Sequence, residues 1–308
     1  MNSAVFPKSV ASQKITAIKA TPNSAAMAYS LLQMASERGV LMLAVVQDSY
    51  AAQLLEHDLK AFKPDFPVLH FPDWETLAYD RFSPHPDLVS QRIECLYRLP
   101  GCHQGVLVVP VTSLMQRIAP AEWIAGQVLN LSVGQKFNLA DERMRLQQFG
   151  YRLVSNVMDA GDFSVRGAII DIFPAGSAMP IRIELLDDEI DSLRLFDPES
   201  QRSEGAQKSF KLLPAREFSL DSDHCKSVRE KLLERFDINP RTCSLYADLK
   251  ENVAPAGIEY YLPLFFEKTG NLLDYMPKNF ELVLASKSLA SAETFWQQVG
   301  QRLSLIHI

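Results

Sequence analysis

The 308-residue sequence has few cysteines, no basic surplus and no long apolar run. Its four cysteines, Cys95, Cys102, Cys225 and Cys243, form no C-x-x-C pair, so we expect reduced thiols rather than a disulfide framework. The longest continuous apolar stretch, residues 40–46, is far shorter than the ~20 residues that a membrane helix needs. The N-terminus lacks the apolar core of a signal peptide. These absences predict a soluble, cytoplasmic chain with no membrane partner.

The charge balance argues against a chain that binds polyanions over its whole surface. Thirty-one Lys and Arg residues stand against 37 Asp and Glu residues, which gives a formal net charge of −6. A whole-chain polyanion binder usually carries a basic surplus, whereas a local basic patch is compatible with this balance. The length and an apolar fraction of 47% predict two or three compact domains.

The first third of the chain alternates strand-like and helix-like segments. The pattern predicts strands at residues 15–20, 40–46, 67–71 and 105–110, and helices at residues 23–38, 49–62 and 87–99. Strands that alternate with helices of this length imply βαβ units and a parallel sheet with right-handed crossovers. We therefore expect an α/β domain over residues 1–132.

The pattern changes after residue 132. A helix is predicted at residues 141–151, followed by extended segments at 163–173, 181–186 and 192–196, with a turn at 187–189. Short strands joined by tight turns indicate an antiparallel meander, so we place an inserted small α+β domain at residues 133–214. Residues 215–302 begin with a helix at 227–236 and include a strand at 280–285. We expect this last part to pack on the first domain.

The final six residues, 303–308 (LSLIHI), look foreign to the rest of the sequence. One reading frame of a transposase adaptor used in sequencing libraries encodes this hexapeptide. We therefore expect a non-native, adaptor-derived tail, a true sequence that continues past Arg302, and a chain that is a fragment of a longer protein.

The turn after the first strand is where a βαβ protein would hold a nucleotide. A P-loop places glycines there so that backbone amides wrap the phosphates, and a lysine that neutralises them. This sequence instead has Pro22, Asn23, Ser24, Ala25 and Ala26, with neither glycine nor lysine. The proline also removes one amide donor. We therefore expect a degenerate, non-functional nucleotide loop.

The remaining candidates for catalysis or metal binding are weak. His85, His103, Cys95 and Cys102 do not have the spacing of a zinc site. No G-x-S-x-G elbow supports a catalytic serine. The acidic run at residues 187–191 (DDEID) falls in a predicted hairpin turn, where carboxylates are ordinary. We therefore predict no catalytic residue and no metal ligand.

One strand carries a more specific pattern. In residues 181–186 (IRIELL), strand alternation sends the first, third and fifth side chains toward the core. Arg182, Glu184 and Leu186 then share the outer face. An apolar anchor beside a charged residue is the composition of a protein-binding patch. The alternative is a solvated sheet face with a single exposed leucine.

Five segments carry a specific resemblance to a known family. They are residues 73–85 (DWETLAYDRFSPH), 105–116 (GVLVVPVTSLMQ), 166–174 (RGAIIDIFP), 187–194 (DDEIDSLR) and 255–266 (PAGIEYYLPLFF). The chain resembles the bacterial transcription-repair coupling factors over essentially residues 15–302. The excision-repair subunit UvrB shares related segments but has an intact P-loop, and this difference separates the two families.

The resemblance implies an N-terminal module similar to UvrB domains 1A, 2 and 1B. Domain 1A (residues 1–132) and domain 1B (215–302) would form a degenerate RecA-like unit, with domain 2 (133–214) inserted. The whole protein would be an ATP-dependent, helicase-like DNA translocase that displaces stalled RNA polymerase from damaged double-stranded DNA. Its motor, with the ATP and Mg²⁺ that the motor uses, would lie outside this chain, so we expect no cofactor here.

The resemblance also implies a partner and the residues that bind it. In the family, domain 2 recruits UvrA through two arginines and a phenylalanine, which match Arg166, Arg182 and Leu186. Leucine for phenylalanine departs from the family pattern and loses ring area, although it stays apolar. Because Arg182 lies on the outer face, we expect its replacement to weaken binding and hardly to change folding.

Two functional hypotheses follow from these observations. The first is a recruitment module for transcription-coupled nucleotide excision repair, which binds UvrA after DNA damage stalls transcription. The alternative is a UvrB-like, ATP-dependent DNA-loading helicase whose nucleotide site lies within these residues. The loop at residues 22–26 favours the first hypothesis.

Overall fold

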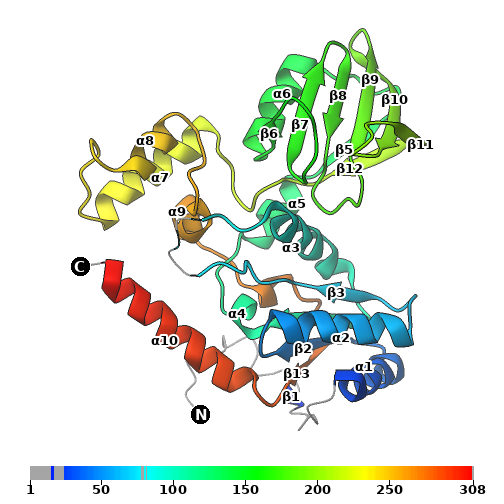
Figure 1. The fold of residues 1–308 in the computed structure, drawn as a ribbon, viewed down its shortest axis with the longest axis vertical. Coiled ribbons are helices and arrows are strands. Elements are labelled where there is room, and N and C mark those ends of the chain that lie inside the picture. Colours follow the sequence, from blue (N-terminus) through cyan, green and yellow to red (C-terminus); the bar gives the residue numbers. More distant parts are fainter. Residues whose placement is uncertain (1–14, 17–23, 78–79, 81, 307–308) are drawn as a thin grey trace. The chain divides into compact units, whose positions relative to one another are not determined.

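The computed structural model describes residues 15–16, 24–77, 80 and 82–306 (Figure 1). The chain divides into two compact units. Unit 1 comprises Met1–Glu75, Arg98–Gln116 and Asn271–Ile308, and unit 2 comprises Thr76–Tyr97 and Arg117–Gly270. The domain boundaries expected at residues 132 and 214 stay predictions. Among the described helices, none has the length and apolar character needed to span a membrane.

A five-stranded sheet lies at the centre of unit 1, with the order β1-β13-β2-β4-β3. All neighbouring strands run parallel. The strands are β1 (Ile15–Thr16), β2 (Leu41–Val46), β3 (Val68–His70), β4 (Gly105–Pro110) and β13 (Phe280–Leu284). Every residue of β2 and β4 is buried, as expected for strands covered on both faces. The predicted α/β class with a parallel sheet is confirmed.

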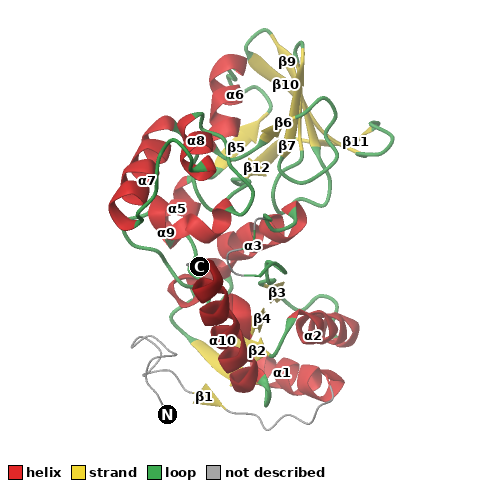
Figure 2. Cartoon of the chain, turned by 60° about the vertical axis from the view of Figure 1, so that its left-hand side comes forward, coloured by secondary structure: helices red, strands yellow, loops and turns green. Residues whose placement is uncertain are grey.

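The helices of unit 1 include the first two that the sequence predicts, whereas the third, predicted at residues 87–99, groups with unit 2. The helices of unit 1 are α1 (Ser24–Arg38), α2 (Ser49–Phe62), α4 (Val111–Leu114) and α10 (Ser288–Ile306), with short 3-10 turns at Leu99–Gly101 and Leu272–Tyr275. Helices α1 and α2 lie side by side (Figures 1 and 2). Helix α2 has the predicted bounds, because the Asp48 carboxylate accepts a hydrogen bond from the Ala51 amide at 2.8 Å and so caps its first turn.

Unit 2 contains a six-stranded sheet with the order β11-β10-β9-β8-β7-β6. Its strands are β6 (Arg152–Leu153), β7 (Asp162–Arg166), β8 (Ile169–Ile172), β9 (Ile181–Leu186), β10 (Glu189–Phe196) and β11 (Ser203–Gln207). All pairs are antiparallel except β6 with β7. The extended segment predicted at residues 163–173 is therefore two strands, because Gly167 turns the chain with a φ of 62°.

One face of this sheet is covered by helix α6 (Leu139–Gln148) and a two-stranded sheet of β5 (Leu129–Ser132) and β12 (Ser209–Leu212). Buried side chains from all of these elements form a single apolar core, which includes Leu131, Leu146, Phe163, Ile183 and Leu193. The separate antiparallel sheet predicted for this part of the chain is confirmed.

The other elements of unit 2 are mostly helical. They are α3 (Pro86–Arg98), α5 (Ala121–Gly126), α7 (Ser222–Arg235), α8 (Ser244–Lys250), a 3-10 turn (Ile258–Tyr261) and α9 (Leu262–Phe265). Helices α7 to α9 have their own apolar core, in which the rings of Phe218 and Phe265 lie 4.4 Å apart. Residues 215–270 thus group with unit 2, while β13 and α10 belong to unit 1.

Two of the family-like segments meet in unit 2 through polar side chains. The Ser83 hydroxyl donates to the Glu259 carboxylate at 2.8 Å and accepts the Gly257 amide at 3.0 Å. The Arg216 guanidinium donates to the same Glu259 at 3.0 Å. Burial lowers the pKa of Arg216, although the Glu259 charge opposes this shift. Residues 73–85 and 255–266 therefore include side chains that hold this unit together.

Candidate protein-binding face

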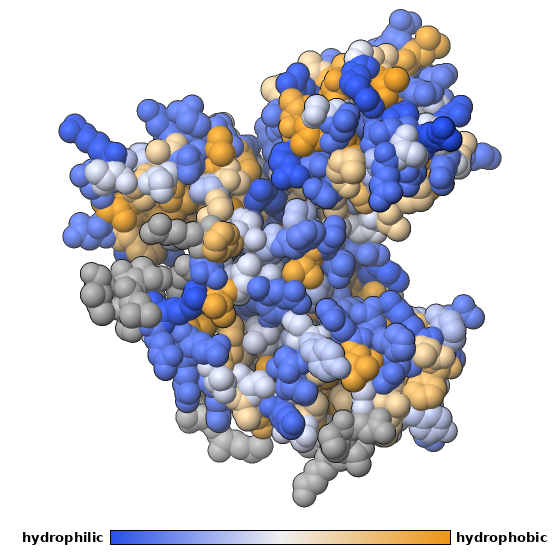
Figure 3. All heavy atoms as spheres, viewed as in Figure 1, coloured by the Kyte–Doolittle hydropathy of each residue, from blue (hydrophilic) through white to orange (hydrophobic). Residues whose placement is uncertain are grey.

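The strand β9 presents its side chains as alternation predicts. Ile181 and Ile183 are fully buried, whereas Leu186 is 67% exposed. Arg182 and Glu184 share the face of Leu186, because successive side chains of a strand point to opposite sides. We call this side of the sheet the outer face. In the view of Figure 3, apolar side chains stand among hydrophilic ones over the part of unit 2 that holds β9 and β10.

A buried carboxylate lies at the centre of the outer face. Asp171 of β8 stands opposite Arg182 of β9, and its side chain is only 1% exposed. Arg182 donates from Nε to Asp171 Oδ1 at 2.7 Å and from Nη2 to Oδ2 at 2.9 Å. Arg166 Nη2 donates to the same Oδ2. The two arginines that the family resemblance selects therefore meet at one aspartate.

Arg182 is a supporting residue more than a solvent-facing one, which corrects the expectation from the sequence. Its side chain is 14% exposed, and its guanidinium lies 4.7 Å from the centre of the buried Phe196 ring. Arg182 Nη1 also donates to the Gln201 carbonyl and the Ser203 hydroxyl, each at 3.3 Å. Hydrogen bonding to Asp171 raises the pKa of Arg182 in spite of its burial.

Arg166 and Leu186 are the exposed members of the predicted set. Arg166 has 48% of its side chain exposed. Ser164 pairs with Asp171 in the register, so Arg166, two residues further along β7, shares the outer face. The alternation of side chains along the sequence could not by itself assign Arg166 to one face of the sheet, because Gly167 follows it and ends the strand. The partly exposed Ile169 is paired with Arg166 on one side and Glu184 on the other.

The structure covers only part of the predicted degenerate nucleotide loop. Pro22 and Asn23 lie outside the described residues, and helix α1 begins at Ser24. Ser24, Ala25 and Ala26 form its first turn, which carries no acidic residue. The loss of nucleotide binding at this loop stays a prediction.

The side chains considered for metal binding do not come together in the described residues. Within that part of the chain, no group of three or more His, Cys, Asp or Glu side chains is arranged to hold an ion. His85 lies 3.5 Å from the Asp87 carboxylate in the first turn of α3, and Cys95 is buried in the same helix. The acidic run is divided between the β9–β10 turn, where Asp187 has a φ of 57°, and the start of β10 at Glu189.

Comparison with known proteins shows what this chain resembles. Residues 129–218 match the UvrB interaction domain. The chain is 39% identical over 272 residues to the transcription-repair-coupling factor of Escherichia coli (strain K12), an alignment that covers 88% of this chain and 24% of that relative. The Haemophilus influenzae factor is 36% identical over 282 residues, with coverages of 91% and 24%. The expected resemblance to transcription-repair coupling factors is confirmed.

A more distant relative agrees with this result. The Bacillus subtilis (strain 168) factor is 31% identical over 266 residues, which cover 82% of this chain and 22% of that relative. The chain thus spans about a quarter of the length of the curated relatives that it matches. The region that matches the UvrB interaction domain includes Arg166, Asp171, Arg182 and Leu186, so the whole outer-face constellation lies within it.

Proposed function

We propose that this chain acts in transcription-coupled nucleotide excision repair and binds UvrA through the outer face of its antiparallel sheet. The observation that carries this proposal is the joint placement of Arg166, Arg182 and Leu186 on one face of the region that matches the UvrB interaction domain. The names and sequences of the relatives support the same pathway.

The geometry supports a division of labour among the three residues. Leu186 supplies an exposed apolar anchor, which can enter a pocket on the partner. Arg166 uses one guanidinium nitrogen on Asp171 and retains other donors for an acidic group of UvrA. Arg182 donates to Asp171 and packs on Phe196, and it thereby holds in place the carboxylate that Arg166 also contacts.

The rest of the proposal concerns the longer protein. We propose that unit 1 is a degenerate RecA-like domain, in keeping with its all-parallel sheet. The whole protein would be an ATP-dependent translocase on double-stranded DNA that displaces stalled RNA polymerase. ATP and Mg²⁺ would then serve motor domains outside this chain, because residues 22–26 offer neither a glycine nor a lysine to a phosphate.

A binding titration of UvrA against the full 308-residue chain tests the proposed face. Arg166→Glu and Leu186→Ser should each weaken binding at least tenfold, because hot-spot residues typically contribute ~2 kcal/mol or more. Arg143→Glu is a matched control, since it reverses an exposed charge on α6, which packs on the opposite side of the sheet. Unchanged UvrA binding by a variant with a normal thermal melt would falsify the assignment of the outer face.

A calorimetric titration with Mg-ATP tests the nucleotide loop separately. The full chain should show no heat of binding, because the loop lacks the groups that cradle and neutralise phosphates. A micromolar dissociation constant would overturn this part of the proposal and support the alternative of a DNA-loading helicase with its nucleotide site in these residues.

A further inference from the structure

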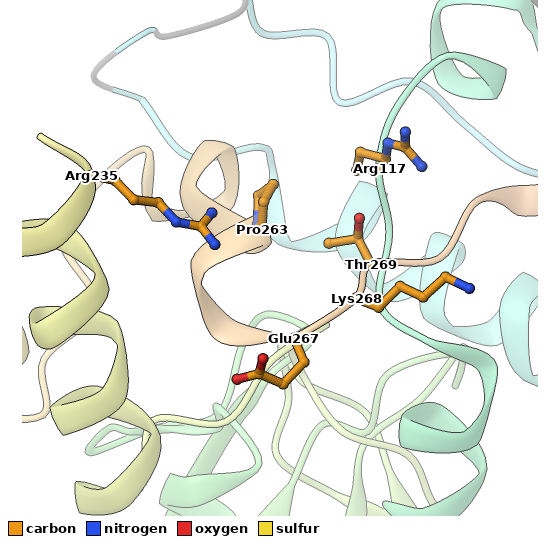
Figure 4. Close-up of a pocket in the computed structure, with 6 residues that line it drawn as sticks. All are labelled: Arg117, Arg235, Pro263, Glu267, Lys268 and Thr269. Carbon is orange, nitrogen blue, oxygen red and sulfur yellow. The ribbon is translucent and has the colours of Figure 1, made fainter.

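A basic pocket in unit 2 takes no part in the outer face. It has a volume of about 460 Å³ and is lined by Arg117, Arg235, Pro263, Glu267, Lys268 and Thr269. Figure 4 shows Arg235 reaching toward Pro263 from α7, with Arg117 and Lys268 on the other side of the pocket. The lining therefore brings together cations from three separate segments of the chain.

The charges of this pocket are not balanced within the protein. Among the described residues, Arg117, Arg235 and Lys268 make no side-chain hydrogen bond or ion pair. The one carboxylate among these lining residues, Glu267, lies 3.4 Å from the ammonium of a further cation, Lys231. The pocket and its rim thus hold four cations, with Lys231 included, against the single carboxylate of Glu267, in a chain whose net charge is −6. Like charges gathered in this way repel one another unless an anion joins them.

The backbone that carries these cations is held by tertiary contacts. Ile118 and Gly270 exchange two backbone hydrogen bonds, of 3.1 and 2.9 Å, which tie the segment of Arg117 to that of Lys268. Gly270 allows this close approach, because a Cβ at that position would lie 2.7 Å from the Ala119 carbonyl oxygen. Arg235 is fixed independently, in the last turn of α7. The cations therefore stand on a preformed frame.

We propose that this pocket binds the phosphate backbone of a nucleic acid. Guanidinium and ammonium groups on a rigid frame recognise phosphate oxygens by charge and hydrogen bonding, with no need for an apolar anchor. A protein partner would instead rely on buried apolar or aromatic side chains, and Pro263 is the only apolar residue in the lining. A local basic pocket of this kind is compatible with the acidic net charge of the whole chain.

The test compares two triple variants of the full chain in fluorescence anisotropy with a short labelled DNA duplex over a salt series. The first variant combines Arg117→Gln, Arg235→Gln and Lys268→Gln. The control combines Arg143→Gln, Lys226→Gln and Lys250→Gln, three exposed cations of unit 2 outside the pocket. The pocket variant should bind the duplex at least tenfold more weakly at low salt. A plot of the logarithm of its binding constant against the logarithm of the salt concentration should also be less steep, by about 2 to 3 in slope, because each lost phosphate contact removes ~0.9.

The control variant should lose less than twofold, and both variants should keep the thermal melt and the UvrA affinity of the natural chain. Equal losses in the two variants would overturn the proposal, because net charge alone would then explain binding. Absence of duplex binding by the natural chain, or preference for a polyglutamate peptide over the duplex, would also overturn it. Retained UvrA binding shows that the result is independent of the outer face.

Discussion

All six residues of β2 in the parallel sheet are buried, whereas β9 in the antiparallel sheet alternates between buried and partly exposed residues and ends with the exposed Leu186. A parallel sheet covered on both faces can offer a ligand only the ends of its strands. An antiparallel sheet that packs one face on a core can expose side chains on the other, and here Arg166 and Leu186 are exposed there although Arg182 is covered. The difference is consistent with candidate protein-binding residues in unit 2, whereas the sequence predicts for unit 1 only a non-functional loop after its first strand.

The largest predicted effect tests the double coverage of the parallel sheet. Leu43 and Ala44 are adjacent in β2, point to opposite faces and are both fully buried. An aspartate at either position would bury an unpaired charge, so we expect Leu43→Asp and Ala44→Asp each to destabilise unit 1 by roughly 4 kcal/mol or more. Hydrogen exchange of the β2 amides measures the loss. Tolerance of one of the two variants would show that one face of this sheet is open.

The second prediction concerns the buried carboxylate of the outer face. Asp171→Asn removes the negative charge that holds Arg166 and Arg182, and we expect a loss of about 3 kcal/mol in the stability of unit 2. Chemical denaturation followed by hydrogen exchange at β8 and β9 measures it. The exposed Asp191→Asn in β10 is the matched control and should change stability by less than ~0.5 kcal/mol. Equal effects of the two variants would contradict a structural role for Asp171.

A third, smaller effect comes from a charged contact at the edge of the parallel sheet. Burial acts to raise the pKa of Glu56, but hydrogen bonds from His70 at 2.7 Å and Lys60 at 2.6 Å outweigh it and lower that pKa to about 2. A carboxylate whose pKa is lowered on folding stabilises the protein above its unfolded pKa of ~4.3. The stabilisation disappears as the pH falls from there toward 2.

We therefore expect unit 1 to lose about 2 kcal/mol of stability between pH 5 and pH 2 through Glu56, with partial solvent screening taken into account. Glu56→Gln should flatten this pH dependence and lower stability at neutral pH by a similar amount. Denaturation of both proteins across this pH range measures the difference. A Glu56→Gln variant that keeps the full acid sensitivity would assign that sensitivity to other carboxylates.

The sequence predicted the face of Leu186 but not the burial of Arg182. Alternation along β9 depends only on the strand itself, and the buried Ile181 and Ile183 confirm it. What covers the outer face depends on other parts of the chain, here Gln201 in the loop before β11 and Ser203 at the start of β11. The alternation of side chains shows on which face Arg182 lies but not what packs over that face, so the sequence predicted an Arg182 that faces solvent.

Asp171 was missed altogether, although a signal for it existed. It lies between isoleucines in residues 168–173 (AIIDIF), and a lone carboxylate in such a buried strand requires a cation nearby. The sequence also could not show that residues 215–270 group with unit 2, because their short helices and loops carry a weak periodicity. Helix α2 was predicted to the residue, because its cap at Asp48 and its apolar stripe are both local.

The smallest predicted effect sharpens the comparison on the outer face itself. Leu186 stands at the position where the sequence resemblance implies a phenylalanine, and at 67% exposure it has room for a larger side chain. Leu186→Phe should leave stability within ~0.5 kcal/mol and increase the affinity for UvrA severalfold, because an aromatic contact adds about 0.5–1.5 kcal/mol. Leu153→Phe on the edge strand β6 controls for a non-specific gain, since that leucine is also exposed. A titration of UvrA against both variants and the natural chain measures the change.

If Leu186→Phe weakened binding, the partner's pocket would be matched to leucine and the inferred equivalence with the family's phenylalanine would be wrong. A gain confined to Leu186→Phe would show that an exposed position on a sheet can be changed to improve binding without repacking a core, which the doubly covered β2 does not allow.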